Sequence, residues 1–123
     1  MSSAQGSERD PSVSHAAGVP NLTQHEQDGA RVIAVRGAFD LNSAPALAVA
    51  LETAAQTYSR VVVDAAGLTF ADFTVLNLLL NFNRKTTGLR LARPAPPLRR
   101  VLELTGANAV LDIRSTVQDA ARP

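Results

Sequence analysis

The sequence predicts an α/β fold, in which a mostly parallel sheet of about four or five strands is covered by about four helices. Short apolar runs that suit strands alternate along the chain with longer segments whose apolar residues recur at helical spacing. The interior has to be aliphatic, because 46% of the 123 residues are hydrophobic but only four Phe, one Tyr and no Trp are present. At this length we expect a single domain.

The N-terminal segment differs in composition from the rest of the chain. Residues 1–20 are rich in Ser, Ala, Gly and Gln and hold few large apolar side chains. Such a segment cannot bury enough surface to offset the entropy lost on ordering. We therefore predict a disordered tail over residues 1–20 and a folded domain over residues 21–121.

The folded part is expected to begin with two strands and a helix. A weak edge strand around Leu22–Glu26 leads through the turn-like pair Asp28-Gly29 into the apolar run Val32–Val35. Asn42 or Ser43 can cap the helix that follows, which carries Pro45 in its first turn. Its apolar residues at helical spacing are Leu47, Leu51, Ala54, Ala55 and Tyr58.

The middle of the chain predicts a central strand and a second helix. Val61–Val63 is apolar on both faces, which is typical of a parallel strand covered on both sides. Asp72 precedes the helix, and Gly88 is expected to end it. The apolar positions of this helix are Val75, Leu78, Leu79 and Phe82, with Leu76 and Leu80 widening the buried face.

The last third of the chain predicts two more strands and two more helices. After a strand over Leu89–Ala92, three prolines introduce a third helix, which Gly106 closes. Val110–Ile113 is expected to form the last strand, and Ser115 to cap a final short helix.

Composition excludes several classes of function. The chain has no Cys, so thiolate metal sites and thiol nucleophiles are excluded, and His15 and His25 are too isolated to form a metal site. No apolar run approaches the roughly 18 residues of a membrane span. The formal net charge is +1, and the cations are scattered without interleaved aromatics. We expect a cytoplasmic protein with no cofactor, metal, nucleic-acid partner or membrane insertion.

Three carboxylates are the nearest approach to a catalytic set. Asp40, Asp64 and Asp72 fall at or near strand ends, where open sheets place their sites. Aspartates at such turns also commonly cap helices, and no histidine or clustered glycine motif accompanies them. We predict no enzyme, and keep an enzyme or small-ligand binder built on these three residues as a competing hypothesis.

The second helix offers a polar surface. Its stripe opposite the predicted core consists of Thr74, Asn77, Asn81, Arg84 and Lys85. Phe73 lies beside this stripe in the first turn, where it either meets a partner protein or folds over the edge of the core.

Several motifs, in order along the chain, resemble the STAS domain of anti-sigma factor antagonists. Arg36–Leu41 with Ala44–Leu47 is similar to the opening "G-x-x-D-x-x-x-A-P-x-L" of that family. Val61–Asp64 and Gly67–Asp72 resemble its central strand and the loop into its switch helix, and Leu98–Gly106 resembles its third helix. The resemblance runs from about Val32 to Ala120 and implies a STAS-like domain.

The resemblance implies a regulator that binds an anti-sigma factor of the kinase-like ATP-binding class and so releases sigma. Phosphorylation of a serine after the aspartate in a D-S-[ST]-G-L pattern reverses this binding. Here the pattern reads Asp72-Phe73-Thr74-Val75-Leu76, so Phe73 occupies the phosphorylated position and Val75 replaces the glycine.

The usual serine switch is therefore expected to be lost. Thr74 is the remaining hydroxyl residue in the motif and the candidate phosphorylation site. The alternative is that its hydroxyl only forms a hydrogen bond with the backbone, as threonines at helix starts commonly do. The predicted partner-binding residues are Asp40, Asp72, Phe73, Thr74, Asn77 and Asn81. The alternative role is a non-catalytic adaptor or scaffold subunit of a larger regulatory or transport complex.

Overall fold

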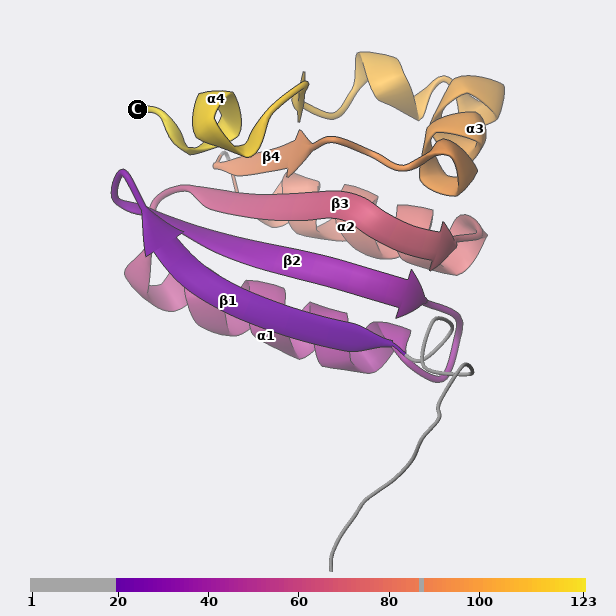
Figure 1. Ribbon diagram of the computed structural model, residues 1–123, viewed down its shortest axis with the longest axis horizontal. Coiled ribbons are helices and arrows are strands. Elements are labelled where there is room, and N and C mark those ends of the chain that lie inside the picture. The colour runs from indigo at the N-terminus through magenta and orange to yellow at the C-terminus, as the bar shows by residue number, and fades with distance from the viewer. Residues whose placement is uncertain (1–19, 87) are drawn as a thin grey trace, which may run out of the picture.

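The computed structural model describes residues 20–86 and 88–123 (Figure 1). Apart from Pro20, the predicted tail over residues 1–20 lies outside the described residues. The strands are β1 (Asn21–Gln27), β2 (Ala30–Ala38), β3 (Val61–Phe70), β4 (Leu89–Ala92) and β5 (Ile113–Arg114). The helices are α1 (Ala44–Thr57), α2 (Phe73–Lys85), α3 (Pro96–Thr105) and α4 (Val117–Ala121), with a 3₁₀ turn, η2 (Ala107–Ala109).

The five strands form one sheet in which spatial order follows chain order, β1-β2-β3-β4-β5. The hairpin pair β1 and β2 is antiparallel, and every other neighbouring pair is parallel. Asp28 and Gly29 both have positive φ, 53° and 81°, as a type I′ hairpin turn requires. The prediction of a mostly parallel sheet with about four helices is confirmed.

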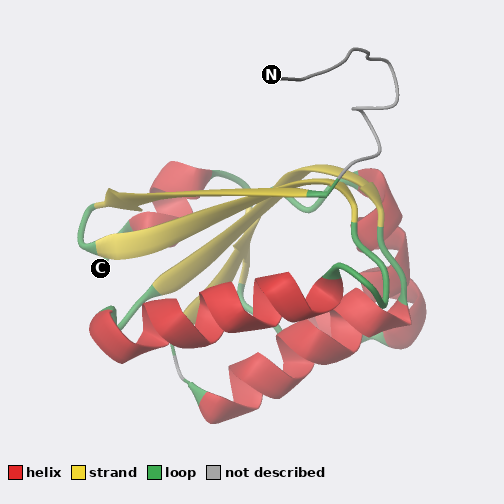
Figure 2. Ribbon diagram, turned by 90° about the horizontal axis from the view of Figure 1, so that it is seen from below, coloured by secondary structure: helices red, strands yellow, loops and turns green. Residues whose placement is uncertain are grey.

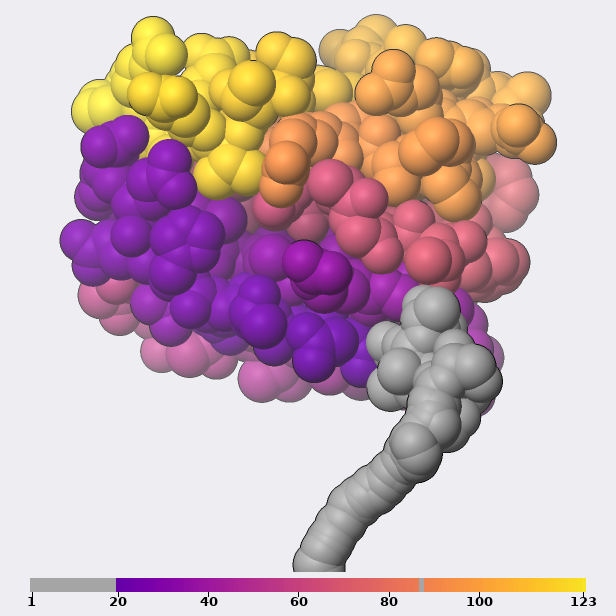
Figure 3. All heavy atoms as spheres, viewed as in Figure 1, coloured from indigo at the N-terminus to yellow at the C-terminus, as the bar shows by residue number. Residues whose placement is uncertain are grey.

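Helices cover both faces of the sheet, but unequally (Figure 2). Successive residues of β3 point to opposite faces, so Val63 enters the large core beneath α1, α2 and α3. Val62 enters a smaller cluster in which Ala120 and Ala121 of α4 pack on the opposite face. Figure 3 shows this second face, where the side chains of β1 lie at the surface beside α4. The predicted two-sided cover of the central strand is confirmed.

Two glycines allow close approaches between backbone segments. A Cβ at Gly88 would lie 1.8 Å from the Ser59 carbonyl oxygen, and one at Gly67 would lie 3.1 Å from the Val35 carbonyl oxygen. Because α2 ends at Lys85 and Thr86 is its C-cap, the prediction that Gly88 ends this helix is wrong. Gly88 instead lets the start of β4 pass the loop before β3.

The C-terminal segment departs from prediction at two places. Gly106 closes α3 at φ 78°, as expected, but Val110 then follows η2 and is 62% exposed, so the predicted strand over Val110–Ile113 shrinks to Ile113–Arg114. Thr116 caps α4 by accepting a hydrogen bond from the Asp119 amide at 3.0 Å. The predicted cap, Ser115, stands one residue too early.

Candidate protein-binding surface

The turn between β2 and α1 is organised by Asp40. Its Oδ1 accepts hydrogen bonds from the backbone amides of Asn42 at 2.9 Å and Ser43 at 3.2 Å, and from the Ser43 hydroxyl at 3.2 Å. The amide of Asn42, followed by that of Ser43, lowers the pKa of Asp40 from its ordinary value of 3.8. Ser43 stands at the N-cap of α1 but makes no side-chain cap bond, so neither Asn42 nor Ser43 caps the helix in the way predicted.

The start of α2 presents one capping aspartate and one exposed aromatic ring. Asp72 caps the helix, as predicted, because its Oδ1 accepts a hydrogen bond from the Thr74 amide at 2.9 Å. Phe73 is the first residue of the helix, and its side chain is 58% exposed. Phe73 is therefore not buried against the edge of the core.

Backbone pairing brings the turn after β2 close to the end of β3. The Phe39 amide donates to the Phe70 carbonyl oxygen at 3.2 Å, and Leu41, 74% exposed, follows two residues after Phe39. Phe70 is also exposed at this end of the sheet. Leu41, Phe70 and Phe73 therefore place three exposed apolar side chains around the carboxyl ends of β2 and β3.

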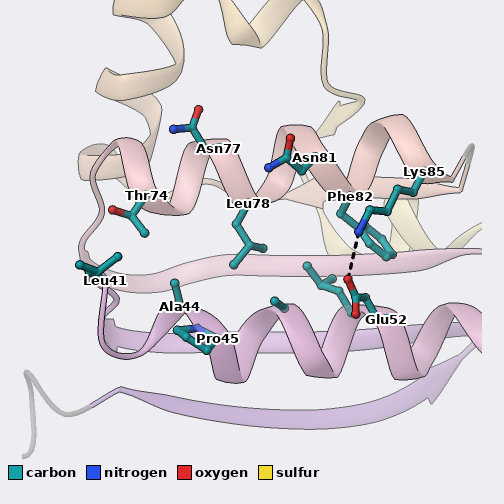
Figure 4. A pocket seen from close by; sticks show the side chains of 12 residues that line it. Leu41, Ala44, Pro45, Glu52, Thr74, Asn77, Leu78, Asn81, Phe82 and Lys85 are labelled. Carbon is teal, nitrogen blue, oxygen red and sulfur yellow. Dashed lines mark hydrogen bonds and ion pairs between the residues drawn. The ribbon is translucent and has the colours of Figure 1, made fainter.

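A groove of about 630 Å³ runs between α1 and α2 (Figure 4). On the α1 side its walls are short, because Ala44, Pro45 and Ala48 face it. Leu78 and Phe82 of α2 form much of its apolar floor. We call this hollow the α1–α2 groove.

Polar side chains lie along the α2 side of the α1–α2 groove and at one end of it. Thr74, Asn77 and Asn81 follow one another at intervals of three and four residues, so they lie along one side of α2. At the far end Lys85 forms an exposed ion pair with Glu52 at 3.2 Å, drawn as the dashed line in Figure 4. Leu41 lies at the opposite end, beside the start of α2.

The six residues predicted to bind a partner thus divide into three kinds. Thr74, Asn77 and Asn81 line the groove, and Phe73 stands exposed at the helix start. Asp40 and Asp72 hold the two turns from which α1 and α2 begin. Four members of the predicted polar stripe, Asn77, Asn81, Arg84 and Lys85, are exposed, away from the buried residues of α2. The sequence did not predict that Thr74, Asn77, Asn81 and Lys85 also line a groove shared with α1.

The three aspartates of the competing enzyme hypothesis have separate structural partners. Asp40 and Asp72 cap turns, whereas Asp64 pairs with Arg93, whose Nη2 lies 2.6 Å from Asp64 Oδ2. Over residues 20–86 and 88–123, no three His, Cys, Asp or Glu side chains are arranged to hold a metal ion. His25 lies on β1, where its ring is within hydrogen-bond distance of Gln27.

In the part of the chain that the structure describes, no helix combines the length and the apolar character needed to cross a membrane.

The structure is an α/β domain with a groove of mixed polar and apolar lining between α1 and α2, and with exposed apolar side chains near the start of α2. A family model described as "Mlab, STAS domain" matches residues 22–113. The chain therefore belongs to the STAS domain family, as its motifs suggested. A search of curated proteins finds no match.

Solved structures with the same fold include proteins described as anti-sigma factor antagonists. One, from Mycobacterium paratuberculosis, is 27% identical over 83% of this chain and 91% of its own, with a TM-score of 0.76. The antagonist SpoIIAA in its unphosphorylated form is 19% identical over 81% of this chain and 92% of its own, with a TM-score of 0.68. A STAS domain protein from Planctomyces limnophilus is 20% identical over 81% of this chain and 94% of its own, with a TM-score of 0.68.

Proposed function

We propose that this protein is an anti-sigma factor antagonist, which binds an anti-sigma factor of the kinase-like ATP-binding class in the cytoplasm and so releases sigma for transcription. The likeness to the mycobacterial antagonist supports this role. The observation that carries the proposal is Phe73, an aromatic side chain that is 58% exposed at the first residue of α2. Aromatic residues of this kind commonly anchor the centre of a protein interface.

The proposed interface extends from Phe73 into the α1–α2 groove. Leu41 contributes a second exposed apolar side chain at the groove's end, and Thr74, Asn77 and Asn81 contribute hydrogen-bonding groups along it. Asp40 and Asp72 act indirectly in this proposal, because each holds the turn that presents Leu41 or Phe73. In this proposal the protein acts by binding its partner and catalyses no reaction.

The proposed antagonist lacks the serine switch. Phenylalanine at position 73 has no hydroxyl to accept phosphate, and in SpoIIAA a phosphorylated form has been observed. Thr74 is the hydroxyl residue that remains, and it lines the groove beside the helix start. A phosphate on Thr74 would add about two negative charges to the proposed interface and so alter binding.

The test compares Phe73→Glu with Val49→Glu for binding to the anti-sigma factor purified from the same cell. Val49 is 63% exposed on α1 and does not line the groove, so it controls for adding a charge to an exposed apolar position. We expect Phe73→Glu to weaken binding about thirtyfold or more, which corresponds to about 2 kcal/mol, and Val49→Glu to leave it unchanged.

Three further results are informative. If Phe73→Glu, folded by circular dichroism, binds as tightly as the wild type, the proposed interface is wrong. Mass spectrometry after incubation with the partner and ATP shows whether Thr74 carries phosphate, which would mean that the switch has moved by one residue. If no anti-sigma factor binds the wild type, the adaptor role is favoured instead.

A further inference from the structure

A second hollow lies between α3 and the ends of β4 and β5. It has a volume of about 540 Å³, and we call it the α3–β5 pocket. Three arginines line it, Arg93, Arg99 and Arg114, against one carboxylate, that of Glu103. Arginines therefore outnumber carboxylates among the lining residues, although Asp64 pairs with Arg93, and both Asp112 and Asp119 pair with Arg114, from outside the lining. The proposed function does not use this pocket.

The backbone brings these three arginines together. The Arg93 amide donates to the Arg114 carbonyl oxygen at 3.0 Å, so the two residues are neighbours at the ends of β4 and β5. Arg99 reaches back from α3, and its Nη2 donates to the Pro94 carbonyl oxygen at 3.3 Å. Three guanidinium groups from three elements thus converge on one small region.

The conformation of Arg93 is unusual for its residue type. Its φ is 50°, in the left-handed region that residues other than glycine, asparagine and aspartate seldom adopt. Such a conformation persists only where the surrounding structure compensates for it, and strained residues of this kind cluster at functional sites. With this backbone conformation, directly after β4, the Arg93 side chain lines the pocket and is also paired with Asp64.

Two of the guanidinium groups are fixed by carboxylates that do not line the pocket. Asp64 accepts from Arg93 Nε at 3.1 Å and from Nη2 at 2.6 Å, and Asp112 accepts from Arg114 Nε at 2.7 Å and from Nη2 at 3.2 Å. Arg114 also donates from Nη1 to the Asp119 carbonyl oxygen at 3.3 Å and to Asp119 Oδ2 at 3.4 Å. Of these two guanidinium groups, it is therefore Arg93 that keeps its Nη1 donors for a ligand within the described residues. Arg99 differs, since its side-chain hydrogen bond within the described residues goes to a backbone carbonyl.

We propose that the α3–β5 pocket binds a phosphate-bearing ligand, with Arg99 as the main contact and Arg93 as the supporting charged donor. Guanidinium groups match phosphate oxygens with paired hydrogen bonds. A phosphate group suits this pocket better than a carboxylate, because it has three terminal oxygens and a larger charge to meet donors from three directions. Ser115 and Asn108 also line the pocket and add neutral donors. This proposal does not rest on the proposed function.

The experiment titrates pyrophosphate into the full-length protein and compares Arg99→Gln with Arg100→Gln. Arg100 is the adjacent residue on α3; it is exposed and does not line the pocket, so its variant removes the same charge from the same helix. We expect Arg99→Gln to weaken binding on the order of tenfold, as the loss of a charge-assisted hydrogen bond predicts. Arg100→Gln is expected to bind as the wild type does, and NMR shifts should centre on Ser115 and Asn108.

A second titration identifies the source of the phosphate. A phosphoserine peptide that binds more tightly than pyrophosphate, with the same dependence on Arg99, supports the proposal and indicates a phosphorylated protein as ligand. Tighter binding of pyrophosphate supports it and indicates a small molecule. The proposal is overturned if neither probe binds, or if Arg99→Gln and Arg100→Gln weaken binding equally, because that result indicates diffuse attraction to surface charge.

Discussion

Asp40 illustrates how one side chain links the stability of a turn to pH. Its hydrogen bonds from the Asn42 and Ser43 amides lower its pKa in the folded protein. A lowered folded pKa stabilises the protein above the ordinary value of 3.8, and this stabilisation is lost as the pH falls through the folded pKa. Asp40→Asn keeps an acceptor oxygen but cannot titrate.

We therefore expect the stability of the wild type to fall more steeply below about pH 4 than that of Asp40→Asn. The measurement is the urea midpoint of each protein as a function of pH, with near-neutral samples as the reference. Two curves that fall in parallel through the acid range would show that the Asp40 carboxylate gains no hydrogen bonds on folding.

Single residues also show how far the site could be predicted. Phe73 and Thr74 could be identified because each position of their motif can be compared with the D-S-[ST]-G-L pattern of the family. Asn77 and Asn81 could be identified because they follow at helical spacing. Ala44 and Ala48 were missed as groove residues, since small side chains in a helix are equally consistent with close packing. The groove depends on how α1 and α2 sit side by side, which no local pattern encodes.

At the scale of elements, α4 depends on its cap because it is only five residues long. Removing the capping hydroxyl in Thr116→Ala leaves the Asp119 amide without its acceptor, and we expect a loss of about 1 kcal/mol of stability. Hydrogen exchange should quicken at the Ala120 amide, which bonds to the Thr116 carbonyl oxygen at 3.1 Å. Urea unfolding and exchange measured by NMR check both effects.

Ser115→Ala is the matched control, because Ser115 precedes the cap by one residue and is exposed. It is expected to change neither the urea midpoint nor the exchange rate. If the two alanine variants behave alike, Thr116 does not cap the helix.

The strands show why some elements were predictable and others were not. Val61–Val63 is a run of β-branched residues and was recognisable as a buried strand, but β3 continues to Phe70 through Ala65, Ala66 and Gly67. The second half of β3 has a low intrinsic strand propensity. It is held in the sheet by its pairing with β2, which contains register shifts. Likewise β5 exists only as two residues paired with β4.

At the scale of the whole molecule, the two faces of the sheet are packed to different depths. Val63 faces the large core under α1, α2 and α3, whereas Val62 faces a cluster made mostly of alanine beneath α4. Both are fully buried. We expect Val63→Ala to cost about 2 kcal/mol, and Val62→Ala about half as much, because short α4 can settle into the space.

Urea unfolding of the two variants checks this order, and an unchanged dependence of the free energy on urea shows that the unfolding reaction is the same. A larger loss for Val62→Ala would mean that α4 is as rigidly packed as the main helix layer.

The alternation of strands and helices was sufficient to predict a mostly parallel sheet with cover on both faces. It did not predict that three helices share one face while one short helix covers part of the other. That division follows from where the crossovers place each helix and from the position of β1 at the edge of the described sheet, which are properties of the assembled fold.

The spatial order of the strands has a consequence for how the protein is made. Because β1 to β5 lie in the sheet in the order of their synthesis, each strand leaving the ribosome finds its neighbour already made. No strand has to wait for a later one before it can pair, and none has to be inserted between two that have already joined. The sheet can therefore grow outward from the β1–β2 hairpin, one edge at a time, as translation proceeds.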